Sequence, residues 1–180
     1  MGASEPASDL KHVLLRKADV SDAHWHLILN HLPVLGVPFG AALLGLGLFR
    51  GQVAIQRAGL SVLVLAGLAA GIAYLTGEPA EHALEAVGSM GTRPEALIEA
   101  HEEAALTATG ITGLGALMAG VGLWRLRRGS GGRGWMASAL TLALVATLAL
   151  GWVATLGGRI SHPEIRPAAP LGTATAPADD

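Results

Sequence analysis

Histidine is the residue type in this sequence with the widest chemical range, because a neutral imidazole binds metals and haem iron and titrates near physiological pH. The chain has seven histidines and no cysteine. Thiolate metal sites, iron–sulfur clusters and covalently attached haem are therefore excluded, and any metal must be held by nitrogen, oxygen or thioether ligands. The histidines are His12, His24, His26, His31, His82, His101 and His162.

Three of the histidines lie next to long apolar stretches. His31 directly precedes one such stretch, His101 comes one helical turn before another, and His162 follows a third by a few residues. His24 lies seven residues before His31 and falls on nearly the same helical face, whereas His26 points roughly to the other side. We therefore expect His31, His101 and His162 to approach one layer from three helix ends.

A layer of histidines on separate helices predicts a site for haem b, whose iron takes two axial imidazoles while its ring lies between the helices. His31 and His101 are the favoured axial pair, and His162 or His24 are substitutes or ligands of a second site. Two arginines after the fourth apolar stretch are placed to meet the haem propionates. The candidate haem-binding residues are His24, His26, His31, His101, His162, Arg159 and Arg166.

Two other interpretations stay open. The same histidines with nearby glutamates form the mixed nitrogen and oxygen set that zinc, copper or non-haem iron accepts, although their spacing matches no standard ligand motif. The chain would then be a metal-binding membrane protein or metalloenzyme. Alternatively, the histidines only form hydrogen bonds, and the chain is a cofactor-free structural subunit of a membrane complex. The candidate metal ligands are His31, His101, His162, Glu99, Glu102 and Glu103.

The elements that must position these residues are membrane helices. The sequence is 51% hydrophobic and only 14% charged, which is a membrane composition. Its net charge of −2 gives no concentrated basic face, so no nucleic-acid partner is expected. Because backbone groups cannot stay unpaired in lipid, we predict an all-α integral membrane four-helix bundle in contact with the lipid bilayer. The four stretches without a charged residue are 32–49, 58–76, 104–124 and 135–156, each near the roughly 20 residues that a span needs.

The charges of the loops predict the orientation of these helices. The loops 50–57 and 125–134 contain arginines and no acidic residue, whereas the loop 77–103 has seven glutamates. Basic loops stay on the cytoplasmic side of a membrane. We therefore expect both termini and all the histidines to lie on the non-cytoplasmic side.

Outside the spans, the sequence divides into three parts. We expect an N-terminal outer segment over 1–23, a four-helix membrane domain over 24–166, and a disordered tail over 167–180, which is rich in proline, alanine and threonine. Proline favours the first turn of a helix, so the acidic loop is predicted to hold a short helix near 79–88. The third long helix should begin near 94, before the membrane.

Glycine pairs at a spacing of four residues occur in the first two spans. Gly36 with Gly40, and Gly67 with Gly71, are small-x-x-x-small pairs that allow helices to approach closely. Helix packing is the favoured interpretation of these pairs, and contact with a flat cofactor is the alternative.

Taken together, these residues resemble an uncharacterised family of four-helix bacterial membrane proteins, some of which are regarded as haem-binding b-type cytochromes. The resemblance implies a multi-pass protein of the bacterial inner membrane that passes single electrons through haem b near the outer face. A redox partner protein or a quinone would exchange electrons with it, and an oligomer or larger membrane complex would be compatible with the family. Ser161 departs from the pattern, since a basic residue is expected there. The matching stretches are 24–33, 74–81, 96–99, 101–103 and 157–166.

Overall fold

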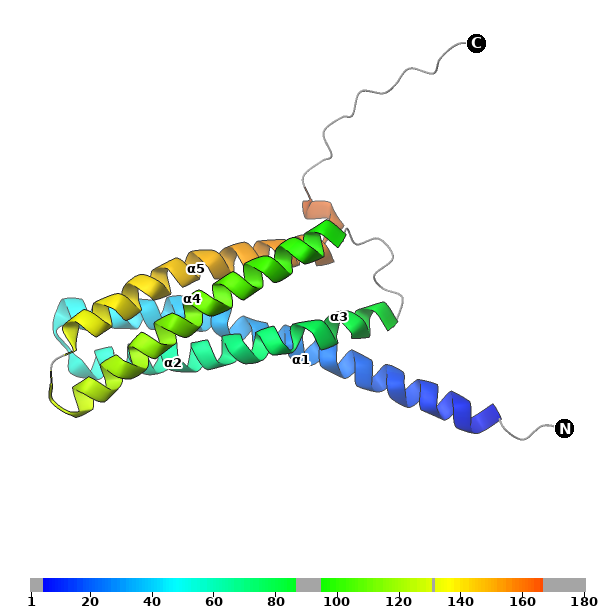
Figure 1. The fold of residues 1–180 in the computed structure, drawn as a ribbon, viewed down its shortest axis with the longest axis horizontal. Helices are drawn as coiled ribbons and strands as arrows, with labels where there is room; N and C mark the ends of the chain where they lie inside the picture. Colours follow the sequence, from blue (N-terminus) through cyan, green and yellow to red (C-terminus); the bar gives the residue numbers. More distant parts are fainter. Residues whose placement is uncertain (1–4, 87–94, 131, 167–180) are drawn as a thin grey trace, which may run out of the picture.

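The computed structural model is entirely helical and describes residues 5–86, 95–130 and 132–166, with side chains described from residue 24 to 82, 95 to 130 and 132 to 166. A short 3-10 helix, Pro163–Ile165, follows the last α-helix. The α-helices are α1 (Glu5–Arg50), α2 (Val53–Leu75), α3 (Gly77–Ala86), α4 (Glu95–Arg127) and α5 (Arg133–Ser161) (Figure 1).

Four segments of these helices are long and apolar enough to cross a membrane, as the sequence predicts. Each is longer than the corresponding charge-free stretch, because a helix continues into its polar flanks while its backbone hydrogen bonds are maintained. The segments are His24–Arg50, Val53–Leu75, Glu95–Arg127 and Arg133–Ser161.

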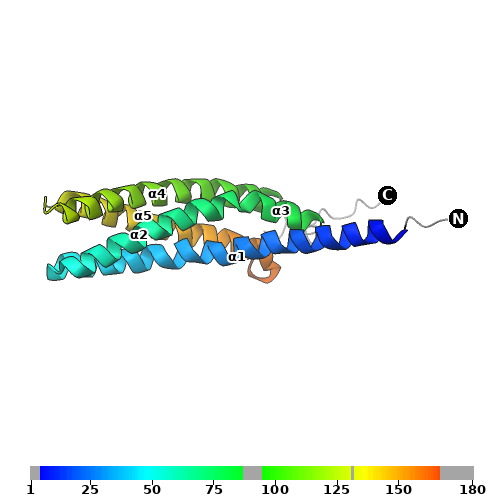
Figure 2. The same ribbon diagram turned by 90° about the horizontal axis from the view of Figure 1, so that it is seen from below.

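The four long helices form an up-and-down bundle in which α1 and α4 each pack against both α2 and α5. Helices α1 and α4 are therefore diagonal to each other. Short turns join α1 to α2 and α4 to α5 at the same end (Figures 1 and 2), where Gly51 and Gly129 have φ values of +66° and +68° that suit glycine. We call this end the arginine end, and the opposite end, where His26, Thr76 and His101 lie, the histidine end.

Small side chains fill the bundle. Most of the buried core residues are alanine, and the largest fully buried side chains are Val37, Leu44 and Leu60. Helices in lipid gain little from hydrophobic burial against one another, so close van der Waals packing of small residues must hold them together. Both phenylalanine side chains and many of the other leucine side chains are instead exposed on the outside of the bundle.

The glycines of the predicted pairs lie mainly at these helix contacts. A Cβ atom on Gly36 would come within 3.1 Å of Cβ of Ala66, and one on Gly67 within 2.3 Å of Cβ of Ala116. Gly40 similarly faces Leu63, whereas a Cβ atom on Gly71 would meet nothing within 4 Å. Helix packing is thus confirmed for three of the four predicted glycines.

The helices outside the apolar stretches follow the predictions closely. Helix α3 extends over Gly77–Ala86 and packs against α1, and α4 begins at Glu95. Helix α1 is continuous from Glu5 onward and continues past the bundle (Figure 2), so most of the predicted outer segment 1–23 is helical. The predicted tail 167–180 lies outside the described residues.

Candidate functional site: two histidines on diagonal helices

The histidine end brings together His26 of α1 and His101 of α4, which lie on diagonal helices. Both side chains are partly buried, and they are close enough for a charge on His101 to act on His26. Each ring also forms a hydrogen bond to a neighbouring element, since His26 contacts Thr76 at the end of α2 and His101 contacts Val153 within α5. All four long helices therefore contribute to this pair.

The hydrogen bonds of these rings define their tautomers. Nδ1 of His101 lies 3.2 Å from the carbonyl oxygen of Val153, which can only accept, so Nδ1 carries the proton. Nδ1 of His26 lies 3.1 Å from Oγ1 of Thr76. Because the Thr76 hydroxyl donates to the carbonyl of Ala73 at 2.9 Å, its oxygen accepts from His26. In the neutral rings, both Nε2 atoms keep their lone pairs for a ligand.

Glycines lie against both rings. A Cβ atom on Gly77 would come within 3.7 Å of Cε1 of His26, and a Cβ atom on Gly157 within 3.2 Å of Cε1 of His101. The imidazole of His101 thus packs closely on the backbone of α5, where a larger residue would displace it. Because glycine has no side chain, Gly77 and Gly157 leave space for the rings of His26 and His101.

The structure places His24 and His31 away from this pair. Both are exposed on α1, and Nδ1 of His31 donates locally to the carbonyl oxygen of Leu27. The two histidines share a face, as expected, but the inward face is that of His26. The sequence contains a signal for this: His26 extends the stripe of buried residues Pro33, Val37, Gly40 and Leu44, whose spacing of 7, 11, 14 and 18 residues follows one side of a helix.

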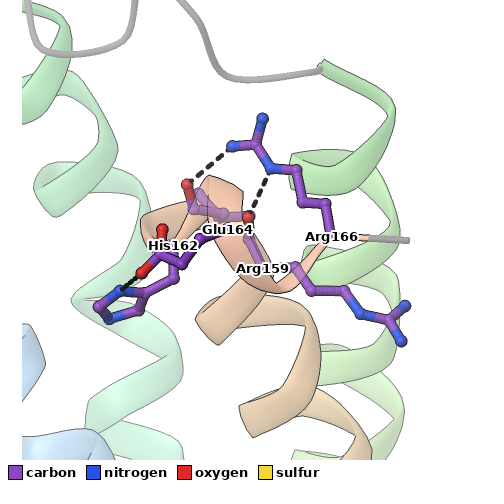
Figure 3. A network of polar contacts seen from close by, with 5 residues as sticks. Arg159, His162, Glu164 and Arg166 are labelled. Carbon is purple, nitrogen blue, oxygen red and sulfur yellow. Dashed lines mark hydrogen bonds and ion pairs between the residues drawn. The ribbon is translucent and has the colours of Figure 1, made fainter. Parts of the chain in front are cut away.

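His162 lies in an exposed pair with Glu164 beyond α5 (Figure 3). Its Nδ1 is 3.0 Å from Oε1 of Glu164, and the two side chains are 61% and 67% exposed. Hydrogen bonds from the backbone N–H of Glu164 and from His162 lower the pKa of the Glu164 carboxyl. No described hydrogen bond or ion pair joins His162 to His31 or His101, so a shared layer of these three histidines stays a prediction.

The two arginines predicted to meet propionates have partners within the chain. Arg166 donates from Nε to the carbonyl of Arg159 at 2.8 Å and from Nη2 to that of Ile160 at 3.2 Å, so it caps the last turn of α5 (Figure 3). The guanidinium of Arg159 lies 5.8 Å from the centre of the Trp152 ring. Both side chains are only partly buried.

The glutamates predicted as metal ligands, Glu99, Glu102 and Glu103, are exposed on α4. Glu102 is close enough for its charge to act on His101. Among the residues that the structure describes, no three histidine, aspartate or glutamate side chains are grouped so that they could hold a metal ion.

The described helices form a four-helix bundle that is long and apolar enough to cross a membrane, with two partly buried imidazoles near each other at one end. Comparison with known proteins gave no match to a family model, to a curated protein or to a solved structure.

Proposed function

We propose that this chain is a membrane-bound electron-transfer protein that holds haem b between His26 and His101. The observation that carries the proposal is the pair of Nδ1 hydrogen bonds, which leaves both Nε2 atoms available on separate helices. Haem iron receives four nitrogens from its porphyrin and needs only two axial ligands from the protein. When bound, haem b supplies reversible one-electron oxidation and reduction.

The partners of the two rings support a ligand role. A metal-binding histidine usually donates its second ring nitrogen to a carbonyl or another acceptor, which orients the ring and raises its basicity. The carbonyl of Val153 and the hydroxyl of Thr76 do this for His101 and His26. We therefore favour His26 over His31 as the partner of His101, because His31 is exposed on the other side of α1.

The ligand number favours haem over zinc, copper or non-haem iron. A structural or catalytic zinc site usually takes three or four protein ligands. The described residues bring two imidazoles together but contain no group of three histidine, aspartate or glutamate side chains that could hold a metal ion. Two protein ligands are sufficient for haem.

A porphyrin needs space between the helices at the histidine end. The cavity among Val37, Thr112 and Ala146 lies deeper in the bundle than the histidine pair and has a volume of only about 10 Å³, so it cannot hold a porphyrin. Haem binding would therefore require the histidine ends of α1 and α4 to move apart. A Cβ atom on Gly71 would meet no neighbour within 4 Å, so this position of α2 makes no close contact that would oppose such a movement. Haem binding is therefore expected to widen the histidine end while the glycine contacts near the arginine end keep their packing.

We assign the arginine end to the cytoplasm and the histidine end, with both termini, to the periplasmic side of a bacterial inner membrane. The two short turns contain arginines, whereas the segment around α3 and the start of α4 is rich in glutamate. Loops rich in arginine and lysine stay on the cytoplasmic side of a membrane. The electron partner would be a second redox protein or a membrane quinone. Assembly into an oligomer or a larger membrane complex is compatible with the large apolar surface of the bundle.

Single cysteines test this orientation directly, since the chain contains no cysteine of its own. Ser161 and Ser130 are exposed at the histidine and arginine ends. In intact cells with a permeable outer membrane, a membrane-impermeant maleimide is expected to label S161C, and to label S130C only after lysis. Labelling of S130C alone in intact cells would reverse the assignment, and the cysteine-free parent is the control.

Absorption spectroscopy tests the cofactor. The protein, produced in haem-supplied cells and purified in mild detergent, is expected to show a Soret band that sharpens and shifts on reduction with dithionite. Pyridine extraction should yield haem b. A purified protein that has no Soret band and takes up no added haemin would disprove the proposal, and a stoichiometric zinc, copper or iron content without porphyrin would favour the metal site instead.

A further inference from the structure

We infer that the arginine end binds the phosphate head group of an anionic phospholipid at the junction of α4 and α5. The site combines arginines of both helix ends with tryptophans next to them in the sequence. Arg125 and Arg128 follow the third apolar stretch, and Arg133 precedes the fourth. Trp124 and Trp135 are the adjoining ends of these two stretches. The inference does not depend on haem binding.

The positive charge of the arginine end is not balanced by acidic residues of the chain. Residues 23–77 and 104–163, which include both short turns, contain no aspartate or glutamate. Arg127, Arg128 and Arg133 are also exposed. Anionic lipids attract basic segments that lie next to a membrane span, so the bilayer can supply the missing negative charge.

The ring of Trp124 positions Arg128 at the edge of the membrane. The guanidinium carbon of Arg128 lies 4.6 Å from the centre of this ring, which is a cation–π distance. Trp124 is the last residue of its charge-free stretch, and tryptophan there marks the head-group level of a bilayer. The guanidinium forms no hydrogen bond or ion pair with the residues that the structure describes. Its N–H groups are therefore available to the phosphate oxygens of a lipid.

The ends of α4 and α5 bring further arginines to the same place. The N–H of Ser130 donates to the carbonyl of Arg125 at 3.1 Å, which closes the end of α4. A Cβ atom on Gly132 would lie 3.6 Å from Cβ of Arg125, so Arg125 and the residue after this glycine, Arg133, extend from adjoining backbone. A phosphate has several acceptor oxygens and can bind guanidinium groups from both helix ends.

Exposed aromatic surface beside the arginines favours a lipid over a phosphate compound dissolved in water. Trp124 and Trp135 are 51% and 38% exposed, and both lie on the membrane side of the arginines in the sequence. Their rings can pack against the first carbons of acyl chains while the guanidinium groups contact the phosphate. A zwitterionic head group also carries an ammonium, which the arginines repel, so the lipid is an anionic one.

Native mass spectrometry of the full chain tests the inference, because it counts the lipids bound to each protein released from a detergent micelle. The protein is titrated with phosphatidylglycerol and, separately, with phosphatidylcholine, and wild type should bind the first phosphatidylglycerol more tightly. R128Q should bind it about fivefold more weakly, the loss expected for one arginine near an anionic surface. R50Q is the matched control, since it removes an exposed arginine of the other turn at the same end, and it should bind like wild type.

A variant that keeps every arginine separates this site from the general charge of the arginine end. W124L removes the ring that positions Arg128 and should weaken phosphatidylglycerol binding by about two- to fivefold, the range for an exposed cation–π contact. Circular dichroism checks that each variant keeps its helix content. The inference is overturned by equal affinity of wild type for the two lipids, by equal losses in R50Q and R128Q, or by displacement of phosphatidylglycerol by an equal concentration of glycerol 3-phosphate.

Discussion

Replacing His101 by Ala is expected to lower the haem content of the purified protein by roughly tenfold or more, the loss expected when a metal site is disturbed. The ring of His101 is held by Val153 and packed against Gly157, and no other described histidine is placed to substitute for it at α4. His26→Ala should have the same effect, because each variant leaves one axial ligand. Haem per chain is measured by pyridine extraction.

Two exposed histidines provide matched controls for this experiment. His24→Ala and His162→Ala remove an imidazole from the same end of the molecule without changing the pair, so both variants should keep the wild-type haem content. Haem retained by H26A or H101A should change from low-spin to high-spin in its electron paramagnetic resonance spectrum. If H26A keeps wild-type haem and H31A loses it, the axial pair is His31 and His101.

Replacing Gly59 by Ala is expected to destabilise the bundle by about 1–3 kcal/mol, the usual cost of overpacking. A Cβ atom on Gly59 would lie 2.5 Å from the backbone nitrogen of Leu44, 2.8 Å from its Cα atom and 3.0 Å from the carbonyl oxygen of Gly40. Backbone atoms cannot rotate away as a flexible side chain can, so α1 and α2 must separate. The free energy of unfolding is measured by titration with sodium dodecyl sulfate in mixed micelles.

Gly71→Ala on the same helix is the control for G59A. A Cβ atom there meets nothing within 4 Å, and alanine favours helix over glycine by about 0.8–1.0 kcal/mol in exposed peptides. G71A should therefore be at least as stable as wild type. Equal destabilisation of G59A and G71A would mean that the close contact of α1 with α2 at Gly59 does not contribute to stability.

The sequence predicts the helices of this protein well, because membrane spans depend on long apolar stretches and not on particular partners. The four apolar helices, the short helix α3 and the start of α4 at Glu95 all follow from charge-free stretches and from the positions of prolines. Helix α1 runs without a break from Glu5 to Arg50, so the outer segment predicted over 1–23 and the first span lie in one helix, and the boundary between them stays a prediction. Even Pro33 and Pro38 lie inside this helix.

The site was harder to predict, because depth along a helix and direction around it are independent. Depth alone pairs His31 with His101. Direction favours His26, which lies on the same side of α1 as the buried residues Val37 and Leu44. The spacing of these residues is visible in the sequence, but only the packing of α1 shows that this side faces the bundle. The hydrogen bonds from Arg166 to the carbonyls of Arg159 and Ile160 depend on a local turn that the sequence does not specify.

The two short turns at the arginine end have a consequence for how the protein is made. They divide the bundle into two hairpins, α1 with α2 and α4 with α5, and each hairpin carries one histidine of the pair. During synthesis the first hairpin leaves the ribosome and can enter the membrane before the second exists. The first hairpin carries only one imidazole of the pair, His26, so the site formed by His26 and His101 can assemble only after both insertion events. A ligand held by both histidines would then join the hairpins, and its concentration would set the temperature at which they separate.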